Sequence, residues 1–118
     1  MQLATAIVLA VTAIANLSIA GADIARAPFV LANSAEVKVP EAWLPGLAFL
    51  KAAGGIGLLL WFAKVPVFPT AAAIGLVCFF IGAVTAHVRA GVIYNIAFPG
   101  AYLALAITSL TLLLLAHT

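Results

Sequence analysis

The sequence predicts an all-α integral membrane protein, a four-helix bundle whose helices run up-down-up-down. Three observations lead to this fold class: 67% of the 118 residues are hydrophobic, only 7% are charged, and the apolar residues fall into four long runs. Globular domains carry about 25% charged residues. Three acidic and five basic side chains cannot cover the surface of a soluble protein of this length, so lipid must be the solvent for most of it.

Each apolar run is about as long as a bilayer is thick. The predicted spans are residues 3–21, 43–63, 69–88 and 96–116. A helix of about 20 residues, rising about 1.5 Å per residue, crosses a hydrocarbon core of about 30 Å. In lipid every backbone polar group needs a partner within the protein, and the runs do not alternate as barrel strands do. We therefore expect helices, in a single domain over residues 1–118.

The first span is expected to be a membrane helix and not a cleaved signal peptide, because no basic stretch precedes it and its apolar run is long. The longest polar stretch, "ADIARAPFVLANSAEVKVPEA", follows it and contains all three acidic residues. Pro28 suits the first turn of a helix, and Val30 and Val37 give that helix a weak apolar edge. We expect a short interfacial segment lying along the membrane surface.

The other two connections are short. "KVPVFP" predicts a tight hairpin between the second and third spans, because Pro66 and Pro69 stop one helix and open the next. Trp61 and Lys64 suit the membrane interface there. "HVRAGVIYN" joins the last two spans, and Pro99 falls in the first turn of the fourth.

The orientation follows from a small difference in basic residues. The connections after the first and third spans share a side and hold Arg26, Lys38 and Arg89, whereas the other side holds Lys64 and the N-terminal amine. The positive-inside rule therefore favours these two connections inside and the termini outside.

Small residues four apart predict close helix packing. Such spacings let another backbone approach closely, which replaces the hydrophobic drive that is missing in lipid. They occur in the second span and twice in the third, at Ala53 and Gly57, Ala71 and Gly75, and Gly82 and Ala86.

The up-down topology gathers most of the scarce polar side chains at one end, because the ends of the first and third spans lie beside the starts of the second and fourth. This end is the predicted binding site, and the sequence identifies no catalytic residue. The candidate ligand-binding residues are Lys51, His87, Arg89, Asn16, Tyr94 and Asn95.

Lys51 lies about two turns inside the second span, where a charge is costly. It either reaches the headgroups or pairs with Asp23 or Glu41, or else it faces the bundle interior as a ligand contact. Gly54 and Gly55, three and four residues later, are expected to clear space beside it and so favour the interior.

The other candidates also have two interpretations each. His87 can exchange a proton near neutral pH, but His87 and Arg89 either contact a ligand or anchor the helix end. If the helix continues through them, they point about 200° apart and would not both face one ligand. Asn16 shares a face with Thr12 and forms either an interhelical hydrogen bond or a ligand contact. Tyr94 is expected at the interface, whereas Tyr102 is deeper and needs a hydroxyl partner.

No haem or metal is expected. His87 and His117 fall at opposite membrane faces, and no histidine–carboxylate cluster is present. The single cysteine, Cys78, cannot form an internal disulfide and is interpreted as a small apolar residue. The basic residues form no patch, so nucleic acid is not an expected partner.

Several stretches resemble the DoxX-like family of small four-span bacterial membrane proteins: "LPGLAFLKAAGGIGLLLWF", "VCFFIGAVTAHVRAG" and "IAFPGAYL". The resemblance runs from about Val39 onward and includes Val39-Pro40 and the His-x-Arg of His87 and Arg89. It implies a link to quinone-coupled sulfur oxidation or to membrane oxidoreductase complexes that handle oxidative stress, although most members have no assigned activity.

Two departures from the family pattern weaken the case for proton-coupled chemistry. Members often carry an acidic residue shortly after the His-x-Arg pair, where this chain has "AGVIY". More distant relatives tend to carry a carboxylate near the place of Lys51.

The leading hypothesis is a multi-pass protein of the cell membrane, a redox-linked small subunit. It would bind a quinone-like or other apolar molecule at the polar end, through hydrogen bonds from Lys51, His87, Arg89 and Tyr94. The alternatives are a non-redox lipophilic-ligand-binding or isomerase-like bundle, and an accessory or structural subunit without chemistry. Whether the chain is an enzyme stays open. The expected partners are the lipid bilayer, a lipophilic small molecule, and either further copies of the chain or a larger membrane complex.

Overall fold

The computed structural model describes residues 2–116, and these fold as helices joined by short connections, with no strand among them. The predicted all-α class is confirmed. Two short 3-10 turns, Glu41–Trp43 and Leu60–Ala63, extend α3 at its two ends. The α-helices are α1 (Gln2–Ile24), α2 (Pro28–Glu36), α3 (Leu44–Leu59), α4 (Phe68–Arg89) and α5 (Ala97–Ala116).

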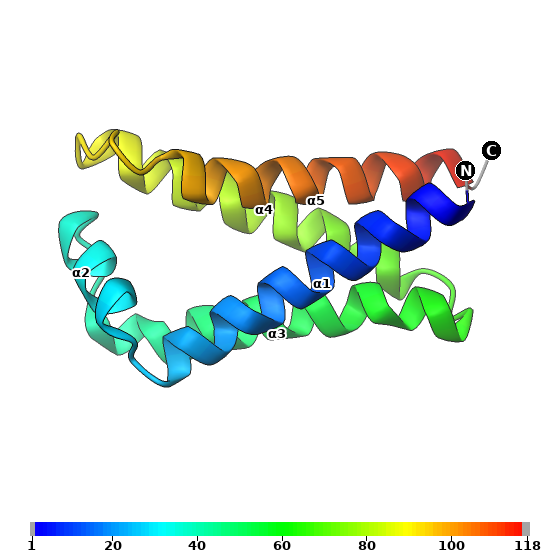
Figure 1. Cartoon of the computed structure of the whole chain (residues 1–118), viewed down its shortest axis with the longest axis horizontal. Helices are drawn as coiled ribbons and strands as arrows, with labels where there is room; N and C mark the ends of the chain where they lie inside the picture. The colour runs from blue at the N-terminus through cyan, green and yellow to red at the C-terminus, as the bar shows by residue number, and fades with distance from the viewer. Residues whose placement is uncertain (1, 117–118) are drawn as a thin grey trace.

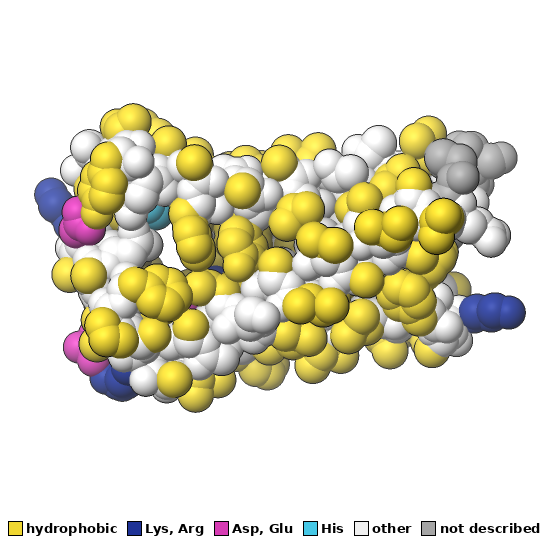
Figure 2. All heavy atoms as spheres, in the orientation of Figure 1, with side chains coloured by type: hydrophobic (Ala, Val, Ile, Leu, Met, Phe, Trp, Pro, Cys, Tyr) yellow, Lys and Arg dark blue, Asp and Glu magenta, His cyan; other side chains and the backbone are white. Residues whose placement is uncertain are grey.

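Four of these segments are long and apolar enough to cross a membrane, as predicted: Gln2–Ile24, Glu41–Ala63, Phe68–Arg89 and Ala97–Ala116. Large apolar side chains such as Leu3 and Phe49 are exposed along them, which suits contact with lipid. Hydrophobic atoms cover the length of the bundle in Figure 2, and the charged groups lie mainly at its two ends.

The four long helices form a ring in which α1 packs against α3 and α5, and α4 packs against the same two helices. The start of α1 and the end of α5 lie close together at one end of the bundle, called here the closed end (Figure 1). Toward the other end, the end of α1 and the start of α3 separate from the end of α4 and the start of α5. The short helix α2 lies at this open end, beside the gap.

The main core fills the closed end of the ring. All four long helices contribute to it, and its buried residues are Leu9, Ala13, Leu58, Ala73, Leu76, Phe80, Ala106 and Leu113. A polar contact crosses it, because the hydroxyl groups of Thr12 and Ser109 lie 3.0 Å apart and join α1 to α5.

Asn16 does not make the interhelical hydrogen bond that was one of the two roles expected for it. The interhelical contact is made by Thr12. Asn16 is fully buried on the face that the sequence indicates, but its Nδ2 donates to the carbonyl of Thr12 in its own helix, at 2.9 Å. Its amide therefore serves α1 and does not reach a neighbouring helix.

Glycines on α3 allow the closest helix contacts. A Cβ built on Gly57 would lie 2.5 Å from Cβ of Ala72 on α4, and one on Gly55 would lie 3.1 Å from the carbonyl oxygen of Ala13 on α1. A Cβ on Gly54 would meet Leu76 at 2.5 Å. The packing prediction for α3 is confirmed, but the expectation that Gly54 and Gly55 clear space for Lys51 is wrong, because neighbouring helices fill that space.

The small residues predicted to make grooves on α4 do not do so. A Cβ on Gly75 or Gly82 would meet no atom within 4 Å, and both glycines are exposed. The spacing of small residues is the same on α3 and α4, so spacing alone does not say which face of a helix is packed.

The connections match the sequence. The turn between Ala63 and Phe68 reverses the chain, with Lys64 and Val67 at positive φ. Pro28 and Pro69 lie in the first turns of α2 and α4. Tyr102, predicted to need a partner, donates its hydroxyl hydrogen to the carbonyl of Ala15 at 3.1 Å.

We expect Gly57→Ala to destabilise the bundle by about 1–3 kcal/mol, the usual cost of overpacking. The added methyl group would lie 2.5 Å from the Ala72 Cβ, and neither group can rotate away, so α3 and α4 must separate. The free energy of unfolding in detergent measures this effect. Gly75→Ala is the matched control, because its Cβ meets nothing within 4 Å; it should be neutral or stabilising by up to about 1 kcal/mol. Equal effects of the two substitutions would contradict the packing argument.

Candidate ligand-binding cavity

A cavity of about 670 Å³ lies at the open end of the bundle, with walls from all five helices. It exists because the helices separate there while α2 lies beside the gap (Figure 1). A hollow is visible between the upper and lower helices in Figure 2. Most of the lining is apolar, and its aromatic members include Phe29, Trp43, Phe79, Phe80, Phe98 and Tyr102. The volume is within the range of about 300–1,000 Å³ that is typical of small-molecule sites.

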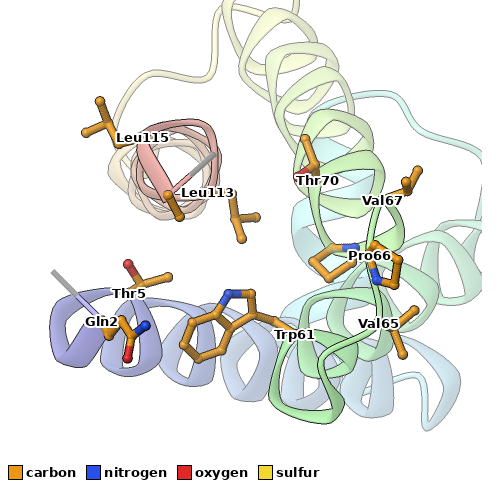
Figure 3. Close-up of a pocket in the computed structure, with 11 residues that line it drawn as sticks. Gln2, Thr5, Trp61, Val65, Pro66, Val67, Thr70, Leu113 and Leu115 are labelled. Carbon is orange, nitrogen blue, oxygen red and sulfur yellow. The ribbon is translucent and has the colours of Figure 1, made fainter. Parts of the chain in front are cut away.

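A second pocket of about 490 Å³ lies at the opposite end. Figure 3 shows Trp61 extending into the space framed by Thr5, Leu113 and Pro66. Its described lining residues include no ionisable side chain. The cavity at the open end is therefore the stronger candidate for a binding site.

An ion pair forms the charged part of the first cavity. Nζ of Lys51 on α3 lies 2.6 Å from Oδ2 of Asp23 on α1, and their side chains are 12% and 3% exposed. Lys51 also lies 5.5 Å from the ring centroid of Phe79 on α4. Of the interpretations open for Lys51, the structure shows the pair with Asp23, and it places that pair in the cavity wall.

Asp23 is available for this pair because α1 continues to Ile24, beyond the predicted end of the span at residue 21. A hydropathy window ends where polar residues begin, whereas the helix continues through them. The ion pair carries no net charge, which lowers the cost of placing either group near lipid.

His87 contributes an unpartnered polar atom. It lies in the last turn of α4, is 4% exposed and lines the cavity. Its Nδ1 lies 3.0 Å from the carbonyl oxygen of Ala83. A carbonyl can only accept a hydrogen bond, so Nδ1 carries the hydrogen. Nε2 then has a free lone pair in the neutral ring, and it is buried with no hydrogen-bond partner.

The connection before α5 attaches α2 to the rest of the bundle. Nδ2 of Asn95 donates to Oδ1 of Asn33 at 2.9 Å, and the hydroxyl of Tyr94 donates to the Glu36 carboxylate. Oδ1 of Asn95 is buried and has no partner. The hydrogen bond to Glu36 raises the pKa of Tyr94 above 10.0, with smaller contributions from desolvation and from the charge of Glu36.

Four of the six candidate residues meet in the cavity: Lys51, His87, Tyr94 and Asn95. Arg89 is exposed and does not line the cavity. Positions two apart on a helix point about 200° apart, so Arg89 faces away from the side on which His87 is buried. Asn16 is buried in the helix packing and also does not line it.

The sequence did not reveal the aromatic wall or the role of Asn33. Phe98 stacks on Tyr102, and Tyr102 lies next to Phe80, with ring centroids 5.4 and 5.2 Å apart. Phe98 and Tyr102 are four residues apart, and this helical spacing is the one feature of the sequence that places them on a common face. Nothing in the sequence pairs Asn33 with Asn95.

The described residues include no group of three or more His, Cys, Asp or Glu side chains that could hold a metal ion. Cys78 is a free, exposed cysteine that lines the cavity. His117 lies outside the described residues, so the predicted separation of the two histidines stays a prediction.

Replacing one member of the buried ion pair should destabilise the protein by about 3–5 kcal/mol, because the other charge is left unpaired. Lys51→Met and Asp23→Leu are the single changes, and the double variant should recover most of the loss. Unfolding free energies in detergent give the coupling. The exposed pair of Arg26 and Glu41 is the control, and Arg26→Ala should cost less than about 1 kcal/mol. Strictly additive effects of the two single changes would contradict the pairing.

Tyr94 should titrate above 10.0, its ordinary value, and Glu36→Gln should lower its pKa, since the hydrogen bond to Glu36 is the largest cause of the shift. The raised pKa means that the folded state favours the protonated phenol. Its contribution to stability is therefore complete below pH 10.0 and is lost as the pH rises through the folded-state pKa. Tyrosinate absorbance in a Tyr102→Phe background isolates Tyr94, because the chain has two tyrosines. An unchanged midpoint in the Glu36→Gln variant would refute the contact.

The sequence model of the DoxX-like family matches residues 7–109, most of the chain. A search of the curated proteins and of the solved structures found no match. The matched range includes every residue that lines the cavity at the open end. With its four apolar membrane-spanning helices, the chain is a multi-pass membrane protein that belongs to the DoxX-like family.

Proposed function

We propose that this protein is a redox-linked small subunit of the cell membrane that binds a quinone-like or similarly apolar molecule in the cavity at the open end of the bundle. The observation that carries the proposal is the combination, in one cavity, of a largely apolar and aromatic wall with buried polar atoms that have no partner. This combination is typical of sites that take an apolar body and orient it by a few polar contacts.

The rim of the cavity supports access from the bilayer. Leu50 and Phe98 both line the cavity, and they are 53% and 49% exposed. The apolar outer surface of the helices therefore continues into the cavity wall. A molecule dissolved in lipid can enter from the side without crossing the aqueous phase.

The charged pair supports a neutral head group. Asp23 balances the charge of Lys51, so the pair attracts no free ion strongly. One hydrogen of the ammonium group is used by Asp23, and an ammonium has three. The remaining hydrogens can be donated to an oxygen of the ligand, which is the role proposed for Lys51.

The cavity also favours a second candidate function, a non-redox bundle that binds a lipophilic metabolite. The same space reaches Lys51, and its shape and polarity do not depend on redox chemistry. The redox element of the first proposal derives from what the resemblance to the DoxX-like family implies. The identity of the bound molecule separates the two.

The test is to purify the full chain in lipid nanodiscs, extract it with organic solvent and identify retained molecules by mass spectrometry. Binding of a short-chain quinone is then followed by the fluorescence of Trp43, which lines the cavity. A Trp61→Phe background removes the other tryptophan of the chain. We expect a retained quinone and saturable quenching.

Two matched variants locate the binding. Gly82 lines the cavity whereas Gly75, two turns earlier on α4, does not, and a Cβ on either glycine meets no atom within 4 Å. Gly82→Phe should reduce quinone binding at least about tenfold, because the added phenyl ring occupies space that the ligand would fill. Gly75→Phe should leave quinone binding unchanged. If the protein neither retains a quinone nor binds one saturably, the first proposal is overturned. A different retained lipophilic molecule would support the second proposal.

A further inference from the structure

We propose that the ligand of this cavity presents a hydroxyl group of the phenol or hydroquinone type to Nε2 of His87, so that the site selects a hydrogen-bond donor over a carbonyl or ether of the same shape. This inference rests on the proposed binding function and adds the polarity of the head group. It follows from which hydrogen-bonding atoms of the cavity are already used.

His87 is held as an acceptor. Because Nδ1 lies 3.0 Å from the Ala83 carbonyl oxygen, this nitrogen carries the hydrogen and the ring is fixed in one tautomer. Nε2 of the neutral ring can then only accept a hydrogen bond. The backbone carbonyl that fixes the ring belongs to the same helix, so no movement of a neighbouring helix is needed to keep this arrangement.

Nε2 is also desolvated. The atom is buried without a partner, and the whole residue is 4% exposed on the cavity wall. A buried acceptor that lacks a hydrogen bond is costly. A ligand hydroxyl removes that cost by donating to Nε2, whereas a carbonyl or ether oxygen has no hydrogen to donate and would place two lone pairs against each other.

A second unpartnered acceptor belongs to another residue that lines the cavity, Asn95. The Nδ2 group of Asn95 donates to Asn33 at 2.9 Å, which leaves Oδ1 of Asn95 buried without a partner. An amide oxygen only accepts hydrogen bonds. His87 and Asn95 therefore offer two buried acceptors from α4 and from the connection before α5.

The charged groups of the cavity do not change this balance. The Glu36 carboxylate accepts a hydrogen bond from Tyr94, and the Asp23 carboxylate accepts one from Lys51. Lys51 is a donor with hydrogens to spare, and the oxygen of a hydroxyl group can accept one of them while its own hydrogen is donated. A quinone carbonyl would satisfy Lys51 and leave His87 and Asn95 unpaired.

The probes are para-dodecylphenol and its methyl ether, which share an apolar tail and ring and undergo no quinone chemistry. They differ in one hydrogen-bond donor, which a methyl group replaces, and the His87→Ala variant below separates the effect of the donor from that of the added methyl group. Both are titrated into nanodiscs that contain the full chain with Trp61→Phe, at about pH 7, where a phenol keeps its proton. Trp43 fluorescence reports binding, and Gly82→Phe nanodiscs give the background from partition into lipid. We expect the phenol to bind about 10-fold more tightly than the ether, from one satisfied buried acceptor.

The variant His87→Ala should remove most of this preference, because it weakens phenol binding and leaves the ether unchanged. Arg89→Ala, two residues away and exposed, is the matched control and should retain the preference. If His87→Ala does not fold, the ratio of the two affinities in the parent protein still decides.

Equal binding of the two probes, or tighter binding of the ether, would overturn this inference and leave the proposed binding function intact. A preference that persists in a folded His87→Ala protein would also overturn it, because the donor would then be recognised elsewhere. Binding of neither probe, together with no binding of the quinone, would overturn the proposed function as well.

Discussion

The ion pair between Asp23 and Lys51 joins α1 to α3 where the bundle is most open, and the cavity depends on it. At the closed end these helices are held by direct backbone approach, with Gly55 against the Ala13 carbonyl. Lipid offers no hydrophobic drive to close the other end. There, a small hydrophobic cluster of Ile19, Val30 and Leu44 packs α1, α2 and α3 together. A charge-assisted contact of 2.6 Å, 3% and 12% exposed at its two side chains, adds to this packing. It holds α1 and α3 together while α4 and α5 separate from them, which leaves space for a ligand.

The helix α2 completes this arrangement. It is too short to cross a membrane, and its attachment to the far side of the gap is through side chains: Asn33 to Asn95 and Glu36 to Tyr94. These contacts bring the connection before α5 against α2. They also orient the Asn95 amide so that its oxygen has no hydrogen-bond partner. The unpartnered oxygen of Asn95 is therefore a product of the same contacts that position α2.

The fold was predictable because lipid imposes a strong rule: composition and the length of the apolar runs determine that the four long helices span. Pro69 and Pro99 mark the first turns of two of them, and Pro28 marks the first turn of the short α2. The site was predictable only in part. The gathering of Lys51, His87, Tyr94 and Asn95 follows from the up-down topology. Which side chain faces inward depends on helix rotation, which a nearly uniform apolar sequence does not specify.

Particular residues illustrate this limit. Gly57 and Gly75 both stand between an isoleucine and a leucine in the sequence, yet Gly57 packs against Ala72 and Gly75 faces open space. The partner of Asn95 lies 62 positions away in the chain, and no local pattern records such a pair. For Lys51 the sequence left Asp23 as one of several alternatives, because the predicted span ended at residue 21 and so left Asp23 outside the helix that places it.

The balanced charge of the cavity has an electrical consequence. Moving one elementary charge across a membrane potential of about 100 mV involves about 2.3 kcal/mol. Lys51 and Asp23 lie together as a cation and an anion, so a neutral molecule that enters or leaves beside them displaces no net charge along the field. Occupancy of the cavity by such a molecule would then depend on its concentration in the bilayer and not on the voltage across that bilayer.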